Sequence, residues 1–197
     1  MTPEGRPNTE QWPPINFLDE RVKLSFHIEP EAAKYLPEVS RADLESGRER
    51  YRILLGNFER TAADAATVMI EGIVEMDEGD ERFYKEGTRE ITNVNIPRIQ
   101  AFARWVAEHI PEFHDFSLIG DIHTHPIKPE AMESGSPWHP SDGDIEDVAK
   151  SYQRGDLTPD HPFVFAIAGP DETGETQYGF YRIIKRGDRY LATDLSD

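Results

Sequence analysis

Residues 120 to 148 read GDIHTHPIKPEAMESGSPWHPSDGDIEDV. The stretch begins at the end of an apolar segment and finishes with apolar residues at helical spacing, so it joins a strand to a helix. His123 and His125 stand two residues apart on that strand, and side chains with this spacing point to the same face. Both imidazoles can therefore reach one point, as two ligands of a zinc ion do.

The second half of the stretch brings an acid toward the same place. Ser141 and Asp144 stand three residues apart ahead of an apolar stripe, the spacing of a capping box, which by itself explains both residues. Asp144 is also our candidate for a third metal ligand, with a fourth position left for water, and the two roles are compatible. Asp142 and Asp147 are the alternative carboxylate ligands.

Strands alternate with helices along the rest of the chain. This order predicts an α/β (α+β) fold, with one mixed sheet flanked by helices. Residues 1–20 hold four prolines and no periodicity, which predicts a mobile tail ahead of a single domain over residues 21–197. The charged segment 77–90 is expected to form a flexible flap. The expected helices cover residues 29–47 (broken at Pro37), 95–111 and 141–155, and the expected strands cover residues 22–28, 52–58, 66–76, 115–125, 162–169, 176–184 and 189–195.

Composition excludes several classes of function. A net charge of −17 argues against a nucleic-acid partner, because no basic patch is available to release counterions. The absence of cysteine excludes disulfides, thiol catalysis and cysteine-based zinc sites. No apolar run approaches the roughly 18 residues that cross a bilayer, and no basic-then-apolar segment opens the chain, so we expect a cytoplasmic protein without membrane contact. The oligomeric state is left open.

The residues resemble the motif of the JAMM (MPN+) zinc isopeptidases, which is a glutamate upstream, then H-[ST]-H-P, then S-x-x-D. The matches are HTHP at residues 123–126, SDGD at residues 141–144 and ERYRILLG at residues 49–56, which puts Glu49 at the family's glutamate. Glu71 is the runner-up for that position. The resemblance covers about residues 22–195 and implies a single MPN/JAB-type domain of cytidine-deaminase-like architecture. The chain departs from the family in Arg52, which replaces a small residue, and in a longer loop between the second histidine and the serine.

The resemblance also implies an activity. One zinc ion would be held by His123, His125 and Asp144, Glu49 would take a proton from the attacking water, and Ser141 would donate to the oxyanion. The implied substrate is the amide bond after the C-terminal tail of ubiquitin or a ubiquitin-like protein, cleaved in deconjugation or precursor processing. That tail would add as a strand beside the flap. A compact domain favours a prokaryotic conjugation, sulfur-carrier or antiviral defence pathway.

Two other functions stay open. One is a catalytically silent scaffold with the same fold. The other is a phosphoesterase of the polymerase-and-histidinol-phosphatase type, whose D-h-H-x-H and S-D-G motifs are echoed here. That class needs many more ligands, and only His139 and His161 follow the motif as histidines. A zinc deaminase would need cysteines.

Other polar residues near the motif have candidate roles of their own. His139 lies in the long loop and could approach the metal, although its flanking prolines favour a turn. Asp121 could orient a ligand from behind it. The remaining histidines are expected to be structural or exposed, and they are His27, His109, His114 and His161.

Overall fold

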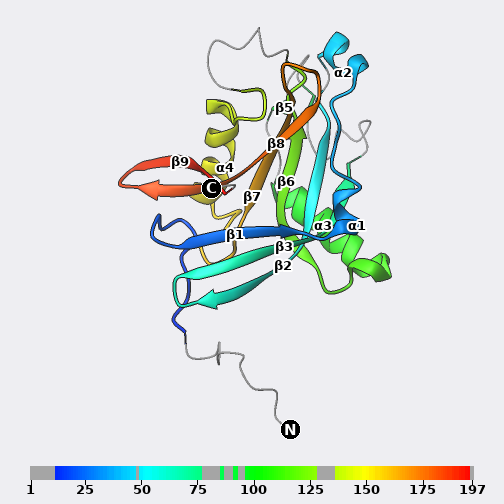
Figure 1. Cartoon of the computed structure of the whole chain (residues 1–197). Coiled ribbons are helices and arrows are strands. Elements are labelled where there is room, and N and C mark those ends of the chain that lie inside the picture. The colour runs from blue at the N-terminus through cyan, green and yellow to red at the C-terminus, as the bar shows by residue number, and fades with distance from the viewer. Residues whose placement is uncertain are drawn as a thin grey trace.

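A seven-stranded mixed sheet organises the protein (Figure 1). The computed structural model describes residues 12–47, 49–76, 85–86, 91–92, 96–127 and 136–195. The strand order is β1-β3-β2-β6-β7-β8-β9; β1 with β3 and β6 with β7 are parallel pairs, and the other pairs are antiparallel. The predicted mixed sheet is confirmed. Its strands are β1 (Lys23–Ile28), β2 (Tyr51–Ala62), β3 (Ala65–Glu75), β6 (Ser117–Thr124), β7 (Val164–Pro170), β8 (Thr176–Arg186) and β9 (Arg189–Asp194), and β4 (Lys85–Glu86) pairs separately with β5 (Ile91–Thr92).

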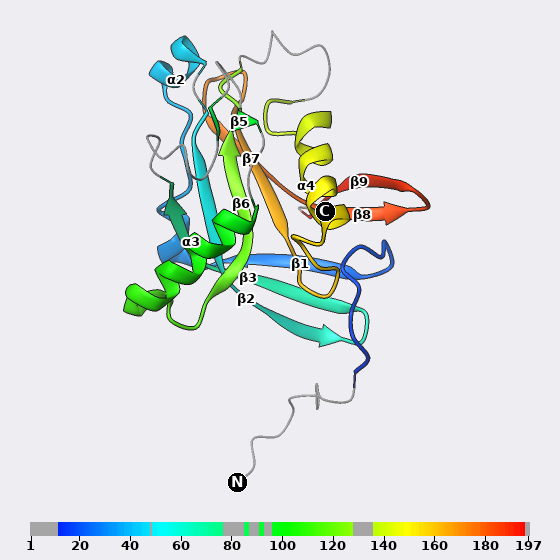
Figure 2. The same cartoon turned by 180° about the vertical axis from the view of Figure 1, so that it is seen from behind.

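The two longer helices, α3 (Ile96–His109) and α4 (Asp142–Arg154), lie on the same side of the sheet (Figure 2). Each presents its predicted apolar stripe to the sheet, with Ile99 and Val106 of α3 and Val148 of α4 in one core. The segment predicted as a broken helix forms two short helices, α1 (Pro30–Ala33) and α2 (Arg41–Ser46), on either side of Pro37. A 3-10 turn, η2 (Pro111–Phe113), follows α3.

The opposite face of the sheet is covered by α1 and by the curl of the sheet itself. Phe26 of β1 stacks on Phe180 of β8, with ring centroids 4.4 Å apart, although four strands separate β1 from β8 in the sheet. Leu54, Ile122 and Ala166 are fully buried in this second core. Burial on both faces explains why β7 is apolar along its whole length.

The packed part of the chain begins before residue 21, so the predicted tail over residues 1–20 is too long. Ile15, Phe17 and Leu18 are buried. The Phe17 N–H donates to the carbonyl of Pro159 at 2.7 Å. Arg182, buried in β8, donates to the carbonyls of Phe17 and Val22. Apolar side chains that directly follow the prolines explain why this segment packs, and residues 1–11 lie outside the described residues.

Two other predicted features fall largely or wholly outside the described residues. These are the flap over residues 77–90, of which the backbone of β4 alone is described, and residue 95, the first residue of the helix predicted over 95–111. Within the described ranges, no helix has the length and apolar character needed to cross a bilayer.

Candidate metal centre

The end of β6 carries two converging imidazoles. His123 Nε2 and His125 Nε2 are 3.1 Å apart, and both rings are largely buried. The backbone N–H of His125 donates to the carbonyl of Ala168 at 2.8 Å, so the pairing of β6 with β7 continues past Thr124. This continued pairing keeps both histidines on the same face, as their spacing predicts.

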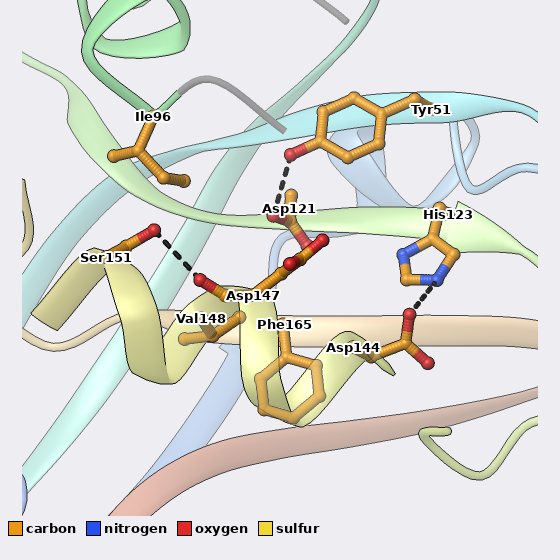
Figure 3. A pocket seen from close by; sticks show the side chains of 9 residues that line it. All are labelled: Tyr51, Ile96, Asp121, His123, Asp144, Asp147, Val148, Ser151 and Phe165. Atoms are coloured by element: carbon orange, nitrogen blue, oxygen red, sulfur yellow. Dashed lines mark hydrogen bonds and ion pairs between the residues drawn. The ribbon is translucent and has the colours of Figure 1, made fainter. Parts of the chain in front are cut away.

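Helix α4 brings the third side chain to the same point (Figure 3). Asp144 Oδ1 lies 3.2 Å from His123 Nε2, and Asp144 Oδ2 lies 3.5 Å from His125 Nε2. The same carboxylate closes a capping box. Oδ2 accepts the Ser141 N–H at 2.6 Å and the Ser141 hydroxyl at 2.8 Å, while Ser141 Oγ accepts the Asp144 N–H at 3.2 Å. Asp144 therefore caps the helix and faces the histidines at once.

The spacing of these donor atoms fits a bound metal ion. Zinc bonds of about 2.0–2.1 Å at tetrahedral angles hold neighbouring ligand atoms about 3.3 Å apart. The separations among His123, His125 and Asp144 are 3.1, 3.2 and 3.5 Å. Two imidazole nitrogens and one carboxylate oxygen are also a donor set that metal ions accept. The cluster could hold a metal ion.

The remaining ring nitrogen of His125 has a fixed partner. Its Nδ1 lies 3.1 Å from the carbonyl oxygen of Pro137. A carbonyl can only accept, so Nδ1 carries the proton of this hydrogen bond. In the neutral ring, the lone pair then lies on Nε2, which faces the cluster, and such outer partners orient metal ligands.

Charges within the cluster favour the ionised forms of His123 and Asp144. Burial lowers the pKa of His123, but the charge and hydrogen bond of Asp144, with Asp121 and Glu49 adding, raise it to about 9. Burial opposes ionisation of Asp144 as well, yet its contacts with His123 and His125 hold its pKa far below the ordinary value. Metal binding therefore has to displace a proton from His123.

Glu49 lies beside the cluster because β2 pairs with β6. Tyr51 stands opposite His123 in this antiparallel pair. Just before Tyr51, the Thr124 N–H donates to the Arg50 carbonyl at 3.0 Å, and the Arg50 N–H donates to Thr124 Oγ1 at 2.8 Å. Glu49 directly precedes Arg50 in the chain, is half-buried, and acts on the pKa of His123 through its charge.

Glu71, the runner-up for the role of Glu49, lies elsewhere. It sits on β3 and accepts a hydrogen bond from Asn57 of β2 at 3.3 Å. The adjacent Gly56 pairs with Ser117, six residues before His123 on β6. Six residues of strand span about 20 Å. The sheet register thus separates Glu71 from the cluster.

Other polar residues near the motif stay outside the cluster. Asp142 is exposed, and Asp147 is half-buried one turn further along α4, next to Lys150. His139 is exposed in a turn, where its Nδ1 accepts the Ser136 N–H. Neither carboxylate nor His139 belongs to the group that could hold a metal.

A buried pair behind His123 was only half predicted. The Tyr51 hydroxyl donates to Asp121 Oδ2 at 2.7 Å, and both residues are buried. Burial raises the pKa of Asp121 to about 6, against the lowering effects of His123 and Tyr51. Asp121 thus acts on His123 through its charge, while it accepts a hydrogen bond from Tyr51, to which the matched stretch 49–56 assigns no role.

These groups border a small cavity shown in Figure 3. Its volume of about 30 Å³ is enough for about two water molecules. The cavity opens beside His123 and Asp144, so it places polar groups and an apolar wall next to the cluster. It is lined by Tyr51, Ile96, Asp121, His123, Asp144, Asp147, Val148, Ser151 and Phe165.

No model of a protein family matches this chain, and no curated protein matches it significantly. The fold and the site by themselves define the class of protein, which is an α/β domain with a mixed sheet and a His-His-Asp cluster that could hold a metal ion.

Proposed function

We propose that this protein is a zinc-dependent isopeptidase or peptidase of the JAMM (MPN+) type. The observation that carries the proposal is the convergence of His123, His125 and Asp144, with the half-buried Glu49 beside them. A glutamate next to a three-ligand cluster is the arrangement that metal-assisted hydrolysis needs, because a base must stand close to the attacking water.

Zinc is the proposed metal because of the donor set. Two histidines and one carboxylate, with a fourth position open, are typical of catalytic zinc sites. Bound there, zinc would polarise the scissile carbonyl and make water more acidic. The hydrogen bond from His125 to Pro137 would keep that ligand in the required tautomer.

Glu49 is the proposed general base, and Ser141 is the proposed hydrogen-bond donor to the oxyanion. Glu49 would accept a proton from the attacking water and pass it to the leaving amine. Ser141 would donate a hydrogen bond to the oxyanion. Its hydroxyl donates to Asp144 in the structure, so it has to exchange that acceptor for the oxyanion. The Ser141 N–H also donates to Asp144 Oδ2 and can hold the carboxylate during the exchange.

The proposed substrate follows from the family resemblance. It is the amide bond after the C-terminal tail of ubiquitin or a ubiquitin-like protein, in deconjugation or precursor processing. The MPN-type architecture is part of the same proposal, and the mixed sheet with α3 and α4 on one face is compatible with it. Prokaryotic conjugation or antiviral defence is the proposed setting.

The two alternative functions receive less support. A silent scaffold would not need to keep a complete donor set next to a glutamate. A phosphoesterase with several metal ions would need more ligand clusters, and within the described part of the chain His, Asp and Glu side chains converge at one place.

The direct test is cleavage of ubiquitin-like fusion proteins by the purified chain, with and without a chelator. We expect about one zinc ion per chain and tail cleavage that the chelator stops and added zinc restores. Glu49→Gln should keep the metal and lose cleavage, because the amide cannot accept the proton. Glu71→Gln is the matched control and should stay active. Cleavage by Glu49→Gln would assign the base to another residue, and a metal-free, fully active chain would refute the proposal.

A further inference from the structure

The last residues of the long loop, 136–140, pack closely on the sheet beside the cluster. Pro137 is buried and lies over Gly169 of β7, where a Cβ atom would come within 2.5 Å of the Pro137 carbonyl carbon. Trp138 lies over Gly179 of β8, where a Cβ atom would come within 2.5 Å of the Trp138 carbonyl oxygen. Glycine at both positions therefore lets the loop backbone lie directly on the strands.

A tyrosine holds this docked segment in place. The Tyr181 hydroxyl, on β8, donates to the carbonyl oxygen of Trp138 at 3.1 Å. The Tyr181 ring is buried against Phe165, with ring centroids 5.7 Å apart. Packing of the ring fixes the hydroxyl, so the position of the Trp138 carbonyl is set by the sheet.

The neighbouring carbonyl is the one that His125 uses. Pro137 O accepts from His125 Nδ1, and Trp138 O accepts from Tyr181. The two carbonyl groups are separated by the two backbone dihedral angles of Trp138, because the peptide units themselves are planar. A shift of one carbonyl therefore moves the other.

We propose that Tyr181 is a positioning residue for the metal ligand His125, acting through the Trp138 and Pro137 carbonyls. The inference rests on the proposed metal site and assigns a role to the end of the long loop. Loss of an outer partner of a metal-bound histidine typically weakens metal binding by about 10- to 100-fold. Removal of the Tyr181 hydroxyl releases the loop end but leaves the Pro137 carbonyl in the chain. The resulting loss of metal affinity should therefore fall in the lower part of that range.

The test is the zinc affinity of Tyr181→Phe, measured by competition with a chromophoric chelator. Tyr178→Phe is the matched control, because Tyr178 is also on β8 and its hydroxyl donates to a proline carbonyl, that of Pro37, at 3.2 Å. We expect binding about tenfold weaker in Tyr181→Phe and unchanged in Tyr178→Phe. Circular dichroism and urea unfolding of both variants report whether the fold is intact.

A second measurement separates positioning from general destabilisation. Nitrogen-15 NMR with assigned imidazole resonances should show His125 protonated at Nδ1 in the metal-free wild type, with that tautomer less populated in Tyr181→Phe. Gly169→Ala, whose Cβ atom would lie 2.7 Å from the Pro137 carbonyl oxygen, displaces that carbonyl while keeping the tyrosine and should weaken zinc binding as well. Equal zinc affinity and an unchanged tautomer in Tyr181→Phe would overturn the positioning role alone. A wild type without zinc affinity would overturn the metal site and this inference together.

Discussion

The charged pair between His123 and Asp144 makes the stability of the metal-free protein depend on pH. Asp144→Asn removes the negative charge that lies 3.2 Å from His123 Nε2. The asparagine oxygen can still accept the Ser141 N–H, so the start of α4 is retained. The substitution therefore tests the charge rather than the helix.

The direction follows from the pKa of His123. Its folded value of about 9 lies above the ordinary 6.5, so the pair stabilises the fold fully below pH 6.5, and the stabilisation is lost as the pH rises through 9. One pKa unit corresponds to about 1.4 kcal/mol, so the rise is worth at most about 3.5 kcal/mol. We expect the unfolding free energy of wild type to fall by up to this amount across the window.

The assay is urea unfolding in the presence of a chelator at pH 6, 7.5 and 9. Asp144→Asn should be less stable than wild type at pH 6, and the difference should shrink toward pH 9. Asp142→Asn, an exposed acid in the same helical turn, should follow the wild-type curve. If the difference in unfolding free energy between Asp144→Asn and wild type stayed constant with pH, the reasoning would be refuted. The His123–Asp144 pair would then not be the source of the pH dependence.

Two further predictions concern the supports of the site and the core. Thr124→Val should cost about 1–3 kcal/mol of unfolding free energy, since the Arg50 N–H loses its acceptor. The control is Thr67→Val, at an exposed hydroxyl pair, which should cost much less. Equal costs would argue against this role of Thr124. Ile99→Ala should cost about 2–5 kcal/mol because the side chain is 1% exposed. Trp105→Ala, at 50% exposure on the same helix, should cost clearly less in chemical denaturation, because its ring stacks on Phe102 and His109 of α3 itself, and an equal loss would contradict the assigned stripe.

The three candidate metal ligands could be predicted because their geometry is set locally in the chain. Alternation along β6 puts His123 and His125 on the same face, and the capping box puts Asp144 at the start of α4. Glu49 was different, since its place depends on the pairing of β2 with β6 across more than seventy residues. The family pattern identified it, and periodicity alone would not have done so.

Of the groups that surround the cluster, Asp121 was a candidate from the sequence, but its partner Tyr51 and the partner of His125 could not be predicted. The group that fixes His125 is a backbone carbonyl, that of Pro137, and a carbonyl leaves no trace in residue type. Tyr51 and Asp121 meet only when two distant strands are in register. Near the N-terminus the apolar residues Phe17 and Leu18 did indicate a packed segment. The prolines just before them outweighed this indication and led to the prediction of a tail.

The double use of Asp144 has a consequence for comparing this protein with diverged copies of itself. A copy that lost the histidines would still need an oxygen at this position to satisfy the Ser141 N–H and begin α4. Selection for folding alone would thus preserve a Ser-x-x-Asp or Ser-x-x-Asn pattern after the histidines had gone. The capping box does not involve His123 or His125, so their joint presence is the better sign that a copy keeps the proposed metal site.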